Sequence, residues 1–125
     1  ISRNKLEISG AGIPPAILYK SKTDSIEYIS LKGLPLGTYV LLDYEEQEYL
    51  IEPGDILLLM TDGVTEMLNS EGEMYETKII EQQIKENSHL AAQEIINQLF
   101  NQANIWRENE PLRDDMTMLV LKIKK

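Results

Sequence analysis

Two apolar runs, each with an aspartate at one end, restrict how this chain can fold. The first run covers residues 56–60 and leads into Asp62, which sits on a Thr-Asp-Gly turn. The second run covers residues 116–123 and begins directly after Asp114 and Asp115. If the runs are adjacent antiparallel strands, the end of the first lies beside the start of the second. Asp62 and Asp114 would then converge on one edge of the sheet, where carboxylate oxygens can hold magnesium or manganese.

Each of these acidic positions also has an ordinary structural explanation. Asp62 could cap a helix that starts near Val64, and the Thr-Asp-Gly turn taken alone favours that role. A second carboxylate opening another apolar strand is rarer than a cap, and it shifts the balance toward a metal ligand. Neighbouring carboxylates on an extended chain point to opposite faces, so we expect one of Asp114 and Asp115 to bind metal. The alternative for this pair is a solvated acidic loop.

Two further residues could support such a site. Gly63 permits a backbone conformation that turns the carboxylate of Asp62 outward. Arg113 could meet a phosphoryl oxygen, although an arginine beside Asp114 and Asp115 more often neutralises them, and we favour that role.

Composition excludes several classes of function. The 125 residues are 42% hydrophobic and 26% charged, which fits one globular domain. Cysteine is absent, so disulfides, thiolate metal sites and cysteine nucleophiles are excluded, and the single histidine, His89, lies in a helical pattern. The net charge of −9 disfavours nucleic acid and anionic membranes as partners, and it would repel a phosphorylated substrate unless cations bind at the site. No apolar run is long enough to span a membrane, and we expect a cytoplasmic protein without direct membrane contact.

Hydrophobic periodicity predicts strands first, then helices, then a closing strand. We expect strands over residues 6–9, 16–20, 25–30, 39–43, 48–51, 56–60 and 116–123, with 39–43 and 48–51 forming a hairpin. We expect helices over residues 64–68, 76–86 and 89–106, the last capped by Ser88. This order indicates an α+β fold with a mostly antiparallel sheet.

Five short segments together resemble the PPM-type metal-dependent serine/threonine phosphatases, in their SpoIIE-like and stress-regulator branch. They are residues 11–15 (AGIPP), 33–37 (GLPLG), 53–55 (PGD), 61–66 (TDGVTE) and 114–117 (DDMT), in the family's order. The resemblance implies an antiparallel β-sandwich flanked by helices, with two manganese or magnesium ions that activate a water against phosphoserine or phosphothreonine. Asp62 and Asp114 match metal ligands of the family, with Gly63, Asp115 and Arg113 as possible supporting residues.

The resemblance also implies that part of the domain is absent. The family's aspartate that bridges both metals belongs to an N-terminal half with no counterpart here, so we expect residues 1–125 to be the C-terminal portion of a single phosphatase domain. Such a portion should be inactive alone and could self-associate through an uncovered face. The implied substrate is a phosphorylated signalling protein, such as an anti-sigma-factor antagonist, and the implied regulator is an upstream sensor domain in the same full-length chain. The alternatives are a catalytically silent regulatory or binding module and a purely structural α+β domain with acidic turns.

Overall fold

The computed structural model describes residues 4–38 and 43–124, which form antiparallel strands and helices. In chain order these elements are β1 (Lys5–Ile8), β2 (Ala16–Lys20), β3 (Ser25–Ile29), β4 (Gln47–Leu50), β5 (Ile56–Met60), α1 (Asp62–Thr65), α2 (Thr77–Glu86), α3 (Ala92–Arg107) and β6 (Met118–Lys122). The expected α+β class with antiparallel pairing is confirmed.

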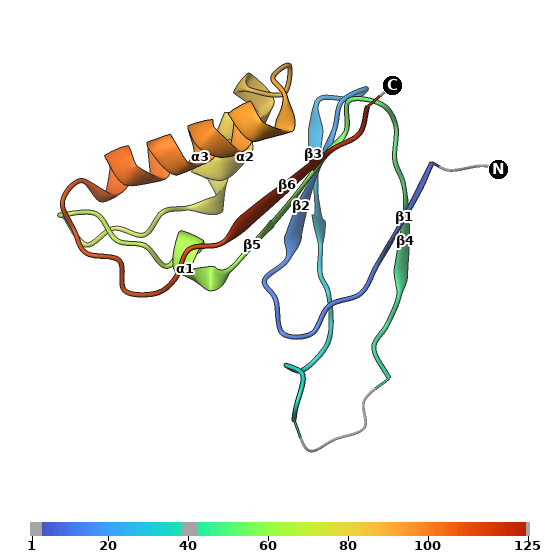
Figure 1. Cartoon of the computed structure of the whole chain (residues 1–125), viewed down its shortest axis with the longest axis horizontal. Coiled ribbons are helices and arrows are strands. Elements are labelled where there is room, and N and C mark those ends of the chain that lie inside the picture. The colour runs from blue at the N-terminus through green and yellow to red at the C-terminus, as the bar shows by residue number, and fades with distance from the viewer. Residues whose placement is uncertain (1–3, 39–42, 125) are drawn as a thin grey trace.

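The elements are arranged in layers. A four-stranded sheet has the order β3-β2-β5-β6, and β1 pairs with β4 in a separate two-stranded sheet. Helices α2 and α3 cover one face of the four-stranded sheet, and the β1–β4 pair lies on its other side (Figure 1). Two strand layers with helices outside one of them agree with part of the flanked β-sandwich that the resemblance implied.

The central strand β5 is apolar on both faces because it separates two hydrophobic clusters. Ile56, Leu58 and Met60 pack toward the helices, while Leu57 and Leu59 pack toward the β1–β4 side. Successive side chains of a strand point to opposite faces, so an uninterrupted apolar run suits a strand covered on both sides. The strand expected over residues 56–60 is confirmed, and it lies between β2 and β6 in the four-stranded sheet.

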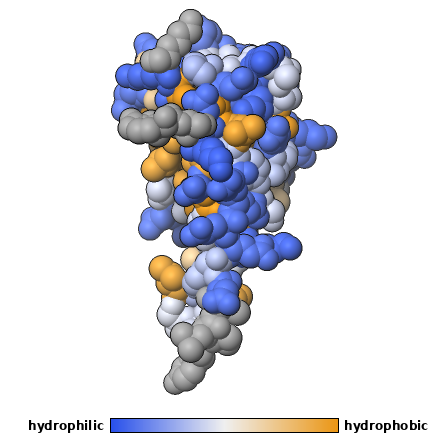
Figure 2. All heavy atoms as spheres, turned by 90° about the vertical axis from the view of Figure 1, so that its right-hand side faces the viewer, coloured by the Kyte–Doolittle hydropathy of each residue, from blue (hydrophilic) through white to orange (hydrophobic). Residues whose placement is uncertain are grey.

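The β1–β4 side of the four-stranded sheet is covered less completely than the helix side. Leu119 and Leu121 of β6 are 52% and 43% exposed, and Leu50 of β4 is 73% exposed. The face seen from β1 and β4 carries scattered apolar side chains between polar ones (Figure 2). Among the described strands, β6 pairs only with β5, so its outer edge is free.

Two sequence predictions differ from the structure. The predicted hairpin falls partly on residues 39–42, which lie outside the described residues, and the partner found for β4 is β1, with Lys5 opposite Leu50. Ser88 does not cap the last helix, which begins at Ala92. The N–H of Ala91 instead donates to the Glu94 carboxylate at 3.0 Å, so the helix is capped at Ala91, three residues after Ser88.

Candidate active site

The pairing of β5 with β6 brings the two predicted acidic segments together. The register places Met60 opposite Met118, so the end of β5 lies beside the start of β6. Asp62 opens α1 two residues after β5, and Asp114 lies four residues before β6. The spatial prediction that both segments meet at one edge of the sheet is therefore confirmed.

Thr61 joins these two segments through three hydrogen bonds. Its N–H donates to the carbonyl of Thr117 at 3.0 Å, and its hydroxyl donates to the carbonyl of Asp115 at 3.1 Å. The same hydroxyl accepts the N–H of Thr117 at 3.0 Å. One side chain thus fixes the acidic connection against the end of β5, a role that the sequence did not predict for Thr61.

Gly63 allows an unusually close approach of the backbone on the other side of Asp62. A Cβ atom placed on Gly63 would lie 2.4 Å from the carbonyl oxygen of Asp115 and 3.4 Å from the carbonyl carbon of Asp114. Any larger residue would push the two acidic segments apart. The structure therefore gives Gly63 a positioning role through lack of a side chain. The special backbone conformation expected from the sequence is not used, because Gly63 lies in α1 and is not among the glycines with positive φ.

The carboxylates at this edge differ in their hydrogen bonding. Asp62 is exposed, and its carboxylate accepts no hydrogen bond from the described residues, so the helix-capping alternative finds no support. Asp114 is exposed, and one of its oxygens accepts the N–H of Asp115 at 2.8 Å. Free carboxylate oxygens remain on both residues, and such hard oxygen donors suit Mg²⁺ or Mn²⁺.

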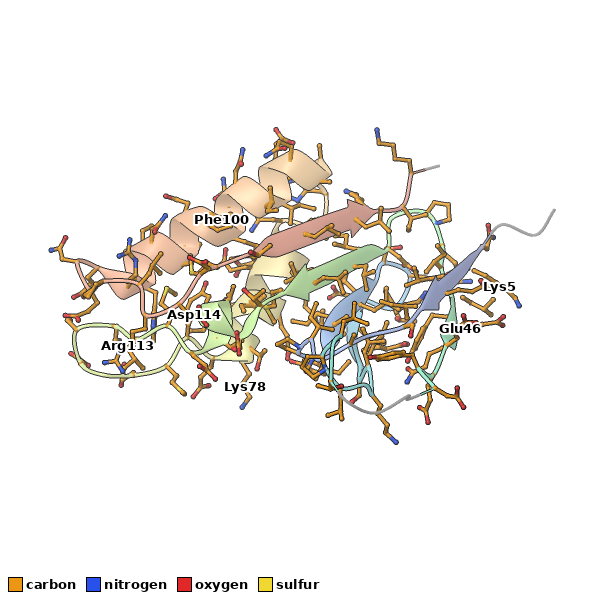
Figure 3. All side chains as sticks on the ribbon, turned by 60° about the horizontal axis from the view of Figure 1, so that its bottom comes forward. Lys5, Glu46, Lys78, Phe100, Arg113 and Asp114 are labelled. Atoms are coloured by element: carbon orange, nitrogen blue, oxygen red, sulfur yellow. The ribbon has the colours of Figure 1, made fainter. Side chains whose placement is uncertain are left out.

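Arg113 does not neutralise its acidic neighbours as we expected. Within residues 4–38 and 43–124 the ion pairs are Lys5–Glu48, Lys20–Asp55 and Lys22–Glu52. Arg113 and Asp114 lie in the connection from α3 to β6 (Figure 3), but no ion pair joins them. The side chain of Arg113 instead lines a small cavity. This cavity lies beside the place where the end of β5 meets the start of β6, near Asp62 and Asp114, which we call the acidic edge.

That cavity has a volume of about 170 Å³ and extends from the acidic edge toward the loop between α1 and α2. Its lining comes from α1, from this loop and from the connection to β6, and consists of Gly63, Glu66, Met67, Leu68, Met74, Arg113 and Asp114. Nothing in the local sequence indicated that Met74 and Arg113 would share a cavity, because they are far apart in the chain.

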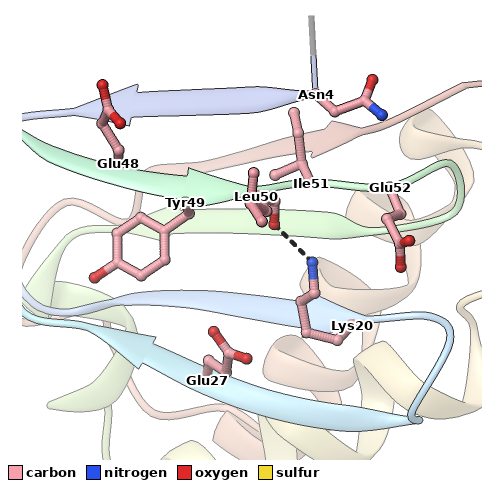
Figure 4. A pocket seen from close by; sticks show the side chains of 8 residues that line it. All are labelled: Asn4, Lys20, Glu27, Glu48, Tyr49, Leu50, Ile51 and Glu52. Carbon is pink, nitrogen blue, oxygen red and sulfur yellow. Dashed lines mark hydrogen bonds between the residues drawn. The ribbon is translucent and has the colours of Figure 1, made fainter. Parts of the chain in front are cut away.

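A larger cavity of about 510 Å³ lies at the opposite end of β5, between β4 and the four-stranded sheet (Figure 4). Lys20 crosses it and donates to the carbonyl of Leu50 at 2.8 Å. Its ammonium group also pairs with the buried carboxylate of Asp55. This cavity is remote from Asp62 and Asp114, so its greater size does not make it the better candidate for chemistry.

The described residues do not by themselves form the two-metal centre that the resemblance implies. Across the described residues, no group of three or more acidic, histidine or cysteine side chains is placed to hold an ion. The chemistry of Asp62 and Asp114 fits a divalent cation, but two carboxylates neither neutralise nor enclose two such ions. The remaining donors would have to come from outside this set of residues.

The described helices include none that is long and apolar enough to cross a membrane.

Comparison with solved structures defines the class of fold. The SiaA PP2C domain of Pseudomonas aeruginosa matches 98% of this chain with a TM-score of 0.81 at 18% identity. The PP2C phosphatase domain of SpoIIE from Bacillus subtilis, solved with a fragment of its regulatory domain, matches 95% with a TM-score of 0.74 at 22% identity. The chain covers 48% and 34% of these two structures, so it has the fold of part of a PP2C-type, or PPM, phosphatase domain.

Sequence comparison defines the family. The model of the family Stage II sporulation protein E (SpoIIE) matches residues 1–124, and the chain belongs to that family. The phosphoserine phosphatase RsbU of Bacillus subtilis strain 168 is 28% identical over 124 residues, which are 99% of this chain and 36% of RsbU. The chain thus spans about a third of the length of this relative. The resemblance read from the five motifs is confirmed.

Proposed function

We propose that residues 1–125 are the C-terminal portion of a metal-dependent protein serine/threonine phosphatase domain. The observation that carries this proposal is the pairing of β5 with β6 in a PP2C-type fold, because the segments that contain Asp62 and Asp114 adjoin the paired ends of these strands. Membership in the SpoIIE family and similarity to a phosphoserine phosphatase support the same activity.

In this proposal Asp62 and Asp114 bind manganese or magnesium. Contacts of Thr61 and Gly63 with Asp115 keep the two ligands close together. The bound metals would supply an activated water for attack on the phosphorus of phosphoserine or phosphothreonine. Such a nucleophile requires neither cysteine nor a catalytic histidine, in agreement with a chain that has no cysteine and one remote histidine. The cations would also reverse the repulsion between an acidic protein and a phosphorylated substrate.

The proposed substrate is a phosphorylated signalling protein of the anti-sigma-factor antagonist type, and the proposed regulator is a sensor domain elsewhere in the full-length chain. The solved SpoIIE relative includes a fragment of a regulatory domain, which supports that organisation. The proposed location, the cytoplasm, follows from the sequence expectation alone.

The test is a pair of ligand substitutions in the full-length protein. Asp62→Asn and Asp114→Asn should each abolish hydrolysis of a phosphoserine peptide with manganese or magnesium, while circular dichroism and thermal unfolding remain close to wild type. Asp24→Asn changes an exposed aspartate far from the site and should keep full activity. Normal rates in both ligand variants would refute the assignment.

The second candidate is a catalytically silent regulatory module with the same fold. It is favoured by one observation, the incomplete set of metal ligands among the described residues. An Asp-Gly pair upstream in the full-length sequence would restore the site and favour the phosphatase, and its absence would favour the silent module. In either case the isolated 125 residues should bind manganese weakly and hydrolyse phosphoserine peptide little or not at all. Robust turnover by this fragment would contradict the proposed division of the site.

A further inference from the structure

The small cavity beside the acidic edge adjoins the proposed catalytic site. Gly63 and Asp114 line the cavity. They also belong to the joint between β5 and β6, by which we mean the close contact of residues 61–63 with residues 114–117. A substrate whose phosphorylated residue reached this edge would place its neighbouring residues within reach of the cavity. The cavity is therefore in a position to contact substrate residues that flank the phosphorylation site.

The wall of the cavity is apolar and held in a defined shape. Leu68 and Met74 face each other in a β-bridge, and the N–H of Tyr75 donates to the carbonyl of Met67 at 2.9 Å. The amide oxygen of Asn69 accepts the N–H of Glu73 at 2.9 Å, which closes the loop between them. This loop is shaped by its own hydrogen bonds, so its apolar wall exists before any ligand binds.

Met74 is the exposed part of this wall. It is 55% exposed although it lies beside the buried Met67. An exposed, unbranched thioether at the rim of a preformed cavity is well suited to packing against ligand side chains of different shape.

The charges around the cavity match a phosphorylated segment of polypeptide. Arg113 lines it and pairs with no acidic residue in the described part of the chain, in a protein of net charge −9. An arginine guanidinium binds phosphoryl oxygens in a bidentate manner. Glu66, which is not a proposed metal ligand, would in turn repel an acidic side chain that entered the cavity.

From these observations we infer that the cavity is a specificity subsite, which binds an apolar side chain adjacent to the phosphorylated serine or threonine of a protein substrate. The inference rests on the proposed phosphatase function and adds to it a preference in substrate sequence. Arg113 attracts the phosphorylated segment, and Met74, Leu68 and Met67 contact the apolar side chain. The subsite selects against acidic residues at the same position.

The test compares phosphoserine peptides that carry leucine, alanine or aspartate at each position flanking the phosphoserine, with the full-length protein and manganese. At one position the wild type should favour leucine over alanine by about tenfold in kcat/KM, because an apolar side chain leaves water. Aspartate should be the poorest of the three. Met74→Ala and Met74→Asp should both reduce the leucine preference, and Met74→Ala keeps the test valid if the aspartate variant fails to fold.

The matched controls are Ile105→Ala and Ile105→Asp, since Ile105 is similarly exposed at 60% but lies on α3 and does not line the cavity. Both should retain the wild-type preference. Equal rates for all peptides with wild-type protein, or an unchanged preference in both Met74 variants, would overturn the subsite while leaving the phosphatase intact. A complete lack of turnover for every peptide with either metal would contradict the phosphatase function, and the subsite with it.

Discussion

Asp55 is fully buried at the start of β5, where its carboxylate is surrounded by donors. The ammonium of Lys20 pairs with it, and the backbone N–H groups of Ser21 and Glu52 donate at 2.8 and 2.9 Å. Burial by itself raises the pKa of Asp55, but the hydrogen bonds from Lys20, Glu52 and Ser21 outweigh burial and lower the pKa below its ordinary value. The charged form of this residue therefore stabilises the fold.

We predict a pH-dependent loss of stability in Asp55→Asn. Because the pKa of Asp55 is lower in the folded state than the ordinary value of 3.8, its contribution is fully present above that pH and is lost as the pH falls through the folded pKa. The variant should lose about 3 kcal/mol of unfolding free energy at neutral pH, because Lys20 is left without its partner. Urea unfolding measured from neutral pH downward should show the gap between variant and wild type closing in acid. A gap that stayed constant with pH would show that the charge of Asp55 is not the cause.

Gly63 gives a second prediction at this scale. Gly63→Ala would place a methyl group 2.4 Å from the carbonyl oxygen of Asp115, and backbone atoms cannot rotate away as a side chain can. We expect a loss of about 1–3 kcal/mol in stability, together with a large loss of metal-dependent activity in the full-length protein. Gly37→Ala is the control, because a Cβ there meets no atom within 4 Å and only its φ of +88° is unfavourable. If Gly63→Ala behaved like Gly37→Ala, close approach at the acidic edge would not matter for function.

Among the secondary-structure elements, the joint between β5 and β6 is the most important for the proposed site. Thr61 provides the side-chain hydrogen bonds that tie the end of one strand to the connection before the other. In Thr61→Val the shape is kept, but the Thr117 N–H and the Asp115 carbonyl lose their partner. We expect about 1 kcal/mol less stability, faster hydrogen exchange at the Thr117 amide and weaker manganese binding in the full-length protein.

Thr23→Val is the matched control for this joint, since the Thr23 hydroxyl lies in the turn before β3 and its hydrogen bond joins it to the side chain of Ser25, the first residue of that strand. It should leave exchange at Thr117 and manganese affinity unchanged. Unaltered exchange at Thr117 in the Thr61 variant would mean that the backbone pairing alone holds the joint.

A different contact explains why the last helix starts later than its sequence suggests. The ammonium of Lys122, on β6, donates to the carbonyls of Ser88 and Leu90 at 2.6 Å each. Those carbonyls belong to the turn between α2 and α3, which is thereby tied to the sheet. Ser88 is a favourable capping residue by type, but the helix begins at Ala92, after this turn.

For the molecule as a whole, β6 has one edge without a paired strand among the described residues and one face that is only partly covered. Leu119 and Leu121 face away from the helices, in register with Leu59 and Leu57 of β5. An open edge beside exposed leucines is prone to pairing with another chain.

We predict that the isolated 125 residues self-associate through this surface. The double variant Leu119→Lys/Leu121→Lys should shift the mass measured by light scattering toward the monomer, because charged side chains oppose edge pairing. Ile105→Lys adds a charge on α3 and should leave the association unchanged. A monomer at all concentrations in the unmodified chain would contradict this prediction.

Much of this architecture could be predicted from patterns a few residues long. The apolar run of β5, the helical stripe that buries Ile95 and Leu99 on α3, and the carboxylates of Asp62 and Asp114 at the ends of apolar runs all follow from such patterns. The partner of β4 could not be predicted in this way. The sequence of residues 47–50 does not indicate whether this strand pairs with one close to it in the chain or with β1, which is more than thirty residues away.

Local periodicity and chain order thus specified the α+β class and the two acidic segments, because strand and helix patterns depend on residues close together in the chain. Tertiary packing alone decided that Thr61 bonds across to Asp115, that Lys122 holds the turn at Ser88, and that Met74 and Arg113 line one cavity. Those contacts join segments separated by tens of residues. Each contact forms only when distant parts of the chain pack into one core. A short stretch of sequence therefore does not predict it.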